Sequence, residues 1–331
     1  MTHNNEAIDS DRILLTIAIP NYNGGENLRR ALESCNHVDL EVVDYEILVV
    51  DNCSTDNSIA IAKDFAPIYQ NLVLKENNAN LGRIGNWNEC LRFARGKYII
   101  FLFANDEIAE SPHLKRKISL MDSQALGLLL SPFILARDSS RTLEKKEAGS
   151  IIYKEPSKFM ASCLADAALP YAPIQANIYN LEVIKDRKIF FDEAFELTSD
   201  QIFSFYVSYY SKRIAFHPIP HIIWNATSTR FHSQVSMDMV VAEDLRTLEY
   251  LERHLKIRVS KHRQSAALIW RILRENVFGN SGKGKAIRGI IRDSKRPELI
   301  LLWLPSILFH KSTRKMLKSF AELRKAEGRW D

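Results

Sequence analysis

Cysteine is scarce in this 331-residue sequence, and no two cysteines form a C-x-x-C pair. The four cysteines are widely scattered, at Cys35, Cys53, Cys90 and Cys163. A disulfide framework or a cysteine-based zinc site needs a closer and more regular spacing. The sequence therefore excludes a small disulfide-stabilised domain and favours a reducing compartment.

Several signature segments are also missing. The first twelve residues, MTHNNEAIDSDR, are polar and include acids, which is atypical of a signal or transit peptide, so we expect a loose N-terminal tail. The first strand-like run leads into PNYNGG and not into G-x-G-x-x-G, which disfavours a Rossmann-type dehydrogenase. The glycine- and lysine-rich stretch at 281–285 lacks the spacing of a phosphate-binding P-loop.

What is present is an ordinary globular composition with an uneven charge. Apolar residues make up 46% and charged residues 26% of the chain, as in a soluble protein with a real core. Residues 271–331 hold 15 Lys/Arg against 6 Asp/Glu, whereas the net charge of the whole chain is only +5. A basic tail on a mildly acidic body indicates that the tail meets an anionic partner.

Within this tail, residues 297–320 combine an apolar centre with a basic end. The apolar centre, 299–309, is too short to span a bilayer and is interrupted by Pro305. One alternative is a helix packed on the body of the protein. The other is an in-plane helix on an anionic membrane surface, with headgroup contacts from Lys311, Arg314, Lys315 and Lys318. No basic strand interleaved with aromatic residues supports a nucleic-acid partner.

Strand-like apolar runs alternate with helical patterns in the first half of the chain, at 13–20, 45–51, 71–77, 97–103 and 126–135. Continuous apolar strands separated by helices predict a mostly parallel sheet covered on both faces. Ligands of such sheets bind beyond the carboxyl ends of the strands. We therefore expect four polar segments to meet at one edge, namely 21–25, 51–54, 82–86 and 105–107.

Two acidic positions each allow two interpretations. Asn105-Asp106 could cap a following helix, or Asp106 could bind a divalent cation that holds a phosphate pair. Asp200 follows Thr198-Ser199 and precedes an apolar helical pattern, which is typical of a helix N-cap. The same carboxylate could serve as a general base. The residue types alone favour the caps.

The order of the polar motifs changes this balance. IPNYNGGENLRRALES, VVDNCSTDNS, NLGRIGNWNECLRFARGKYIIFLFANDEI and TSDQIFSF follow one another. Together they resemble the family 2 glycosyltransferases, which have the GT-A fold, over about residues 12–235. The resemblance implies an α/β, Rossmann-like domain with a mostly parallel central sheet flanked by helices, plus a C-terminal helical extension. We expect a tail at 1–11, the GT-A domain at 12–236 and a basic helical region at 237–331.

The resemblance also implies roles for individual residues. Pro20 and Tyr22 would line the base pocket, and Asp51 or the neighbouring Asn52 would hydrogen-bond the base. The other nucleotide-sugar contacts would be Asn23, Arg83, Asn86 and Asn105, with Arg83 near the base or diphosphate. Asp106 and His232 would contact the metal, Mn²⁺ or Mg²⁺, and Asp200 would be the general base.

Two departures from the family pattern affect these roles. Many members carry two acids where this chain has Asp51-Asn52, which leaves uracil, thymine and cytosine open as the donor base. Phe103 and Asn105 stand at positions that are often acidic. Because hard cations prefer carboxylates to amides, we expect a metal site with less negative charge and weaker binding.

The resemblance implies an inverting glycosyltransferase. Its donor would be a nucleoside-diphosphate sugar and its acceptor a hydroxyl of a glycan or lipid-linked saccharide, in cell-surface polysaccharide synthesis of the O-antigen or capsule type. The expected location is cytoplasmic, peripheral on the inner face of the plasma membrane. The alternative is a catalytically impaired nucleotide-sugar-binding protein, motivated by the reduced metal motif.

Overall fold

A computed structural model describes residues 13–137, 140–144, 150–165, 173–225, 237–255 and 257. The chain divides into two compact units, one formed by Met1–Pro156 and Tyr171–Ser228 and the other by Ser157–Pro170 and Thr229–Asp331. His232, the expected N-terminal tail and the segment 297–320 lie outside the described residues. The domain boundaries expected from the sequence stay a prediction.

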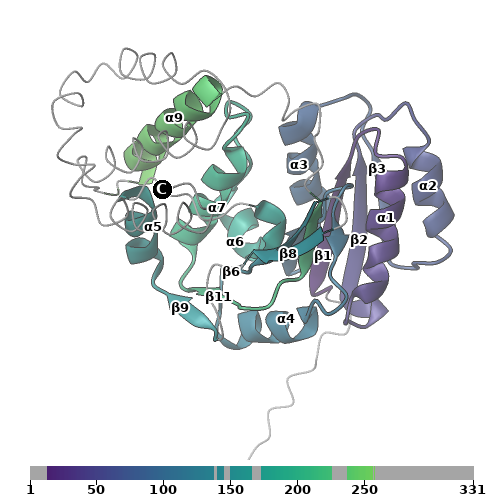
Figure 1. Cartoon of the computed structure of the whole chain (residues 1–331), viewed down its shortest axis with the longest axis horizontal. Helices are drawn as coiled ribbons and strands as arrows, with labels where there is room; N and C mark the ends of the chain where they lie inside the picture. The colour runs from purple at the N-terminus through teal and green to yellow at the C-terminus, as the bar shows by residue number, and fades with distance from the viewer. Residues whose placement is uncertain are drawn as a thin grey trace, which may run out of the picture. The chain divides into compact units, whose positions relative to one another are not determined.

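An eight-stranded sheet forms the centre of the first unit (Figure 1). Its order is β3 (Leu72–Glu76), β2 (Tyr45–Asp51), β1 (Leu15–Asn21), β4 (Tyr98–Phe101), β10 (Asn177–Asn180), β6 (Leu128–Leu130), β11 (Ile214–Phe216) and β9 (Ile152–Lys154). The strands from β3 to β4 are parallel, as are β6 and β11. Only β10 and β9 run antiparallel to their neighbours. The expected α/β fold with a mainly parallel sheet is confirmed.

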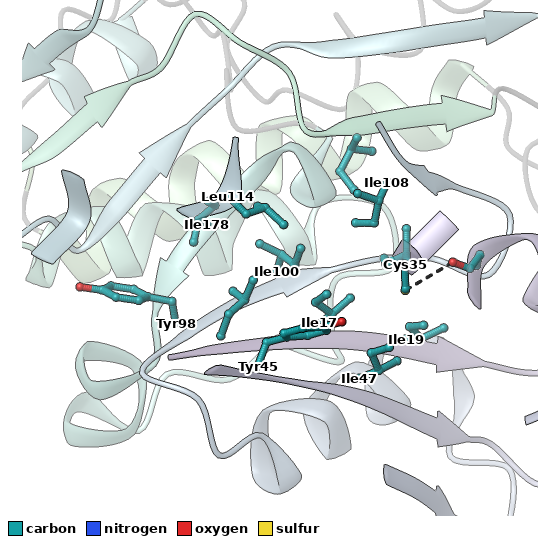
Figure 2. Packing of buried hydrophobic residues seen from close by; sticks show 14 of the residues in the cluster. Ile17, Ile19, Cys35, Tyr45, Ile47, Tyr98, Ile100, Ile108, Leu114 and Ile178 are labelled. Atoms are coloured by element: carbon teal, nitrogen blue, oxygen red, sulfur yellow. Dashed lines mark hydrogen bonds between the residues drawn. The ribbon is translucent and has the colours of Figure 1, made fainter. Parts of the chain in front are cut away.

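Both faces of the sheet are covered, which is why its central strands β1 and β2 are mainly apolar. All seven residues of β1 and of β2 are buried. Helices α1 (Glu26–Ser34) and α2 (Ser58–Phe65) lie on one face, and α3 (Gly82–Phe93) lies on the other (Figure 1). Alternate strand residues such as Ile17, Ile47 and Ile100 pack together on the side of α1 and α2 (Figure 2).

A four-stranded sheet lies beside this core, in the order β5 (Glu107–Ile108), β12 (Ile222–Asn225), β7 (Phe133–Arg137) and β8 (Ser140–Glu144). The prediction of one strand over 126–135 is wrong, because β6 and β7 belong to different sheets. Pro132 falls between them, and proline has no N–H to donate to a strand ladder.

The other described helices are α4 (Leu114–Ser123), α5 (Pro156–Ala165), α6 (Leu181–Arg187), α7 (Ser199–Tyr210) and α9 (Met237–Leu255), with short 3₁₀ turns at Cys35–His37, Val42–Asp44 and η3 (Ile174–Ala176). Within the described ranges, no helix has both the length and the apolar character needed to cross a bilayer.

Candidate functional site

Side chains join the carboxyl ends of β1 and β2. Asn21 Nδ2 donates to Asp51 Oδ1 at 2.7 Å, and Ser54 Oγ donates to the same oxygen at 2.6 Å. The backbone N–H of Ser54 donates to Asp51 Oδ2 at 2.8 Å. Since each carboxylate oxygen can accept two hydrogen bonds, one acceptor position on Oδ2 is left without a partner among the described residues. Three donors thus hold the buried Asp51 carboxylate in one orientation at this edge of the sheet.

Both the nitrogen and the oxygen of the Asn52 side-chain amide form hydrogen bonds within the protein. Its Nδ2 donates to Asn80 Oδ1 at 2.8 Å and to the Gly82 carbonyl at 3.1 Å. Its Oδ1 accepts from Asn77 Nδ2 at 3.1 Å and from the backbone N–H of Leu81 at 2.9 Å. The Asn52 side chain therefore ties the start of α3 to the end of β2.

Asn86 fastens the next turn of α3 to the same strand ends. Its Nδ2 donates to the Val50 carbonyl at 3.1 Å, and its Oδ1 accepts from Asn77 Nδ2 at 2.9 Å. A Cβ built on Gly24 would lie 3.3 Å from Ala104 Cβ, so the turn after β1 also touches the segment after β4. Hydrogen bonds thus join three of the four expected segments, 21–25, 51–54 and 82–86, whereas the meeting with 105–107 stays a prediction.

The turn after β1 differs in exposure from residue to residue. Pro20 is buried within β1, whereas Tyr22 is 51% exposed. Asn23 has a φ of 51°, and its Oδ1 accepts from the backbone N–H of Thr55 at 2.8 Å. Tyr22 therefore offers an aromatic ring to solvent at the edge where the buried Asp51 lies.

Asp106 is almost fully buried, with both carboxylate oxygens engaged by N–H groups. Oδ2 accepts from Gln175 Nε2 at 2.8 Å. Oδ1 accepts from the backbone N–H of Asn225 at 3.0 Å and from Asn105 Nδ2 at 3.2 Å. The helix-cap interpretation is wrong, because β5 follows at Glu107 and the N-cap of the next helix is His113.

Burial raises the pKa of Asp106 to about 7, because a charged carboxylate loses its hydration there. The hydrogen bonds from Asn225 and Gln175 act in the opposite direction, and the charge of Glu107 raises the pKa further. The surrounding N–H groups thus partly replace the water that the buried carboxylate has lost.

The fit of a divalent cation depends on what surrounds Asp106. No group of three or more His, Cys, Asp or Glu side chains that could hold a metal exists among the described residues. Asp106 Oδ2 keeps one acceptor position beside its bond from Gln175. Mg²⁺ is often held by one or two carboxylates together with substrate phosphates. A cation at Asp106 would therefore depend on a diphosphate for most of its ligands.

Phe103 stands at a position that is often acidic in the family, and in this structure its side chain makes an aromatic contact. Its ring stacks on Trp87 of α3 with centroids 5.1 Å apart. The guanidinium carbon of Arg83 lies 4.7 Å from the centroid of Trp87. Arg83 also donates a hydrogen bond to the carbonyl of Glu196, in the loop before α7. An exposed cation thus lies between the start of α3 and the loop that leads to Asp200.

Asp200 lies in the first turn of α7, where the N-cap residue is Thr198. The N-cap interpretation of Asp200 is therefore wrong by two positions. Its Oδ1 accepts from the backbone N–H of Gln201 at 2.8 Å. Burial raises the pKa of Tyr179, and the nearby charge of Asp200 raises it further. The half-buried carboxylate of Asp200 therefore lies close to Tyr179. Tyr179 belongs to β10, the strand that follows Gln175.

Four residues at this edge escaped the sequence analysis as individual contributors: Asn21, Ser54, Gln175 and Asn225. Asn21 and Ser54 fall inside polar segments that the sequence marked only as turns. Gln175 and Asn225 are 69 and 119 positions from Asp106, and no spacing or motif connects them to it.

Residues 16–166 match the sequence profile of the family described as Glycosyl transferase family 2. These residues form a family 2 glycosyltransferase domain. The matched range includes the ends of β1, β2 and β4, and therefore also Asp51 and Asp106.

Two bacterial proteins resemble the chain in sequence. The poly(ribitol-phosphate) beta-glucosyltransferase of Bacillus spizizenii is 25% identical over 205 residues, which cover 61% of this chain and 30% of that protein. The poly(ribitol-phosphate) beta-N-acetylglucosaminyltransferase TarS of Staphylococcus aureus is 24% identical over 192 residues, or 57% of this chain and 31% of TarS. The chain thus spans about a third of these relatives.

Solved structures resemble the family 2 domain in fold. S. aureus TarS 1–349 in complex with UDP-GlcNAc aligns with a TM-score of 0.64 at 18% identity, over 89% of this chain and 81% of that one. A Pyrobaculum calidifontis mannosyltransferase in complex with GDP-Man and Mn²⁺ aligns with a TM-score of 0.51 at 13% identity, over 95% of this chain and 81% of that one. The fold is therefore GT-A.

Proposed function

We propose that this domain transfers a sugar from a nucleoside diphosphate to a hydroxyl of a cell-surface polymer. The observation that carries the proposal is that hydrogen bonds join the ends of β1 and β2 to the start of α3, while N–H donors hold Asp51 there and Asp106 after β4. Ligands of open α/β sheets bind at such edges. The family and the named relatives support the reaction class.

The donor base in this proposal is uracil. Asn52 has its amide occupied, so we expect Asp51 to contact the base through its remaining acceptor position. An acceptor-only group pairs with the imide N–H of uracil or thymine, whereas on cytosine it could accept only from the exocyclic amino group, because N3 is itself an acceptor. Tyr22 is exposed and available to stack on the ring. The complex of TarS with UDP-GlcNAc supports uracil over thymine.

Asp106 would hold the divalent cation in this proposal, together with the diphosphate of the donor. Such a cation neutralises charge on the leaving nucleoside diphosphate. Arg83 would add a second cationic contact, because a guanidinium matches phosphate oxygens well. The metal role predicted for His232 stays a prediction, since that residue lies outside the described part of the chain.

Asp200 would take the proton from the acceptor hydroxyl as the C–O bond to the sugar forms. A single carboxylate base on the face opposite the leaving group leads to direct displacement and inversion at the anomeric carbon. The position of Asp200 in the first turn of α7 suits an ionised form, since the positive end of the helix dipole favours a negative charge.

The acceptor in this proposal is a hydroxyl of an anionic polymer, as the names of the poly(ribitol-phosphate) transferases suggest. An O-antigen or capsule acceptor remains the alternative. Membrane contact by residues 297–320 also stays a prediction, because they lie outside the described residues.

Thermal-shift measurements with UDP, dTDP, CDP, GDP and NAD, each with and without Mn²⁺, test the proposal. We expect UDP with Mn²⁺ to raise the melting temperature most. Stabilisation by NAD alone would contradict the transferase assignment. Binding of UDP-sugars without any release of UDP, with or without a polymer acceptor, would indicate a nucleotide-sugar-binding protein that has lost catalysis.

A further inference from the structure

Gln175 supplies a side-chain contact to Asp106 from a distant part of the chain. It lies in η3, just before β10, and is 3% exposed. Its Nε2 donates to Asp106 Oδ2 at 2.8 Å. A buried glutamine that donates to a buried carboxylate satisfies both groups, so this hydrogen bond has at least a structural value.

The hydrogen-bond donors are divided unequally between the two oxygens of Asp106. Oδ1 accepts from the Asn225 backbone and from Asn105 Nδ2, which uses both of its acceptor positions. Oδ2 accepts only from Gln175, so it carries the one acceptor position still open among the described contacts. The direction of that open position is set by the place of the Gln175 amide.

The backbone that carries Gln175 is held on both sides. On one side, β10 pairs with β4, with Tyr179 opposite Ile99. On the other, the backbone of Gln175 lies beside the buried ring of His221. The Nδ1 of this ring is 3.1 Å from Nζ of Lys117, which is fully buried and also donates to the Ile219 carbonyl at 2.8 Å. A side chain on so constrained a segment can hold its partner in one orientation.

We propose that Gln175 is a positioning residue for Asp106, which turns the open acceptor position of Oδ2 toward the cation bound with the donor diphosphate. The inference rests on the proposed function, in which Asp106 holds that cation. Groups that hydrogen-bond to a metal ligand fix its orientation, and their loss commonly weakens metal binding by about 10–100-fold. A merely structural Gln175 would instead affect folding and all ligands alike.

The test measures Mn²⁺ binding directly, by titration calorimetry and by the electron paramagnetic resonance of free Mn²⁺, on protein saturated with UDP. Gln175→Met keeps the length of the side chain and removes its N–H donor. We expect Gln175→Met to weaken Mn²⁺ binding about 10-fold or more. The affinity for UDP in EDTA should stay within about twofold of wild type, because the base contacts are untouched. Equal losses in both affinities, or an unchanged Mn²⁺ affinity, would overturn the inference.

Two further variants keep the test decisive if Gln175→Met folds poorly. Gln175→Asn keeps the amide but shortens the side chain by one methylene, so we expect the same selective loss of Mn²⁺ affinity. Gln124→Met is the matched control, because Gln124 accepts a hydrogen bond from Arg213 and, among the described residues, makes no hydrogen bond to Asp106 or Gln175. It should bind Mn²⁺ as wild type does.

Asp106→Asn separates failure of this inference from failure of the proposed function. If Asp106→Asn abolishes Mn²⁺ binding while both Gln175 variants bind normally, only the role of Gln175 is wrong. If Asp106→Asn binds Mn²⁺ like wild type, Asp106 is not a ligand, and both the inference and the cation part of the proposed function are wrong.

Discussion

The side-chain amide of Asn21 donates a hydrogen bond of 2.7 Å to Oδ1 of Asp51, so β1 and β2 are joined by side chains just where their ladder ends. Both residues are 1% exposed. A hydrogen bond to a buried charged group contributes about 1.5–3 kcal/mol, more than one between neutral groups. We therefore expect Asn21 to influence nucleotide binding through Asp51, without touching the nucleotide itself.

Asn21→Leu should weaken UDP binding about 10-fold, which corresponds to about 1.4 kcal/mol. The reason is that Asp51 loses one of its three N–H or O–H donors and its carboxylate becomes free to turn. Titration calorimetry with UDP measures the change. Asn71→Leu is the control, because Asn71 donates to the Tyr45 carbonyl at the opposite end of β2. Equal affinities for the two variants would contradict the role of Asn21.

Gly24→Ala should lower the free energy of unfolding by about 1–3 kcal/mol, as expected when an atom is forced into a packed region. The added Cβ would lie 2.1 Å from Asn21 Oδ1, so the Asn21 side chain must move. Urea denaturation measures the loss. In an Asn21→Ala background the same substitution should cost less, since the colliding oxygen is gone. An undiminished cost in that background would show that the collision is elsewhere.

Asp200→Asn should reduce sugar transfer at least about 100-fold, because the variant has no group to take the acceptor proton. UDP affinity should change less than about twofold. The assay measures UDP released from UDP-GlcNAc in the presence of poly(ribitol phosphate). Asp186→Asn, on the exposed surface of α6, is the control and should turn over normally. Normal turnover of Asp200→Asn would remove it as the base.

The pH dependence of stability should carry a contribution from His217. Burial, with the positive charges of Lys117, Arg116 and His113, lowers the pKa of His217 from 6.5 to about 4, although a hydrogen bond with the backbone of Ile219 opposes this. The unfolded chain therefore takes up a proton at higher pH than the folded protein does. The free energy of unfolding should fall as the pH drops from about 6.5 to about 4, by up to about 1.4 kcal/mol per pH unit from this group.

Urea denaturation at pH 7, 6 and 5 checks this expectation. His217→Gln should show a shallower fall than wild type over that range, because the variant has no imidazole to protonate in the unfolded state. The same fall in both proteins would mean that His217 does not contribute.

The sequence predicted most of the parallel sheet, because its buried strands are continuous apolar runs that end in polar turns. Tyr45–Asp51 matches the predicted strand at both ends. The second sheet was not foreseen, since β5 has only two residues and β7 was merged with β6 across Pro132. Short strands that pair over long sequence distances leave little periodicity to detect.

The candidate site was predictable only in part, for a related reason. Asp51 and Asp106 end apolar strands, and this local signal marked both. The occupied amide of Asn52 depends on Asn77, Asn80 and the start of α3, which come together only in the folded chain. The donor from Gln175 depends on η3 lying against the turn after β4. Neither arrangement has a sequence signature.

A crystal structure of the protein with UDP and Mg²⁺ would show whether Asp106 holds the cation and Asp51 the base. We expect the uracil to lie against Asp51 and the Mg²⁺ to be bound by Asp106 Oδ2 at about 2.1 Å, with the diphosphate on the same ion. Asp106 oxygens bonded only to Gln175, Asn225 and Asn105, with the nucleotide diphosphate elsewhere, would contradict it.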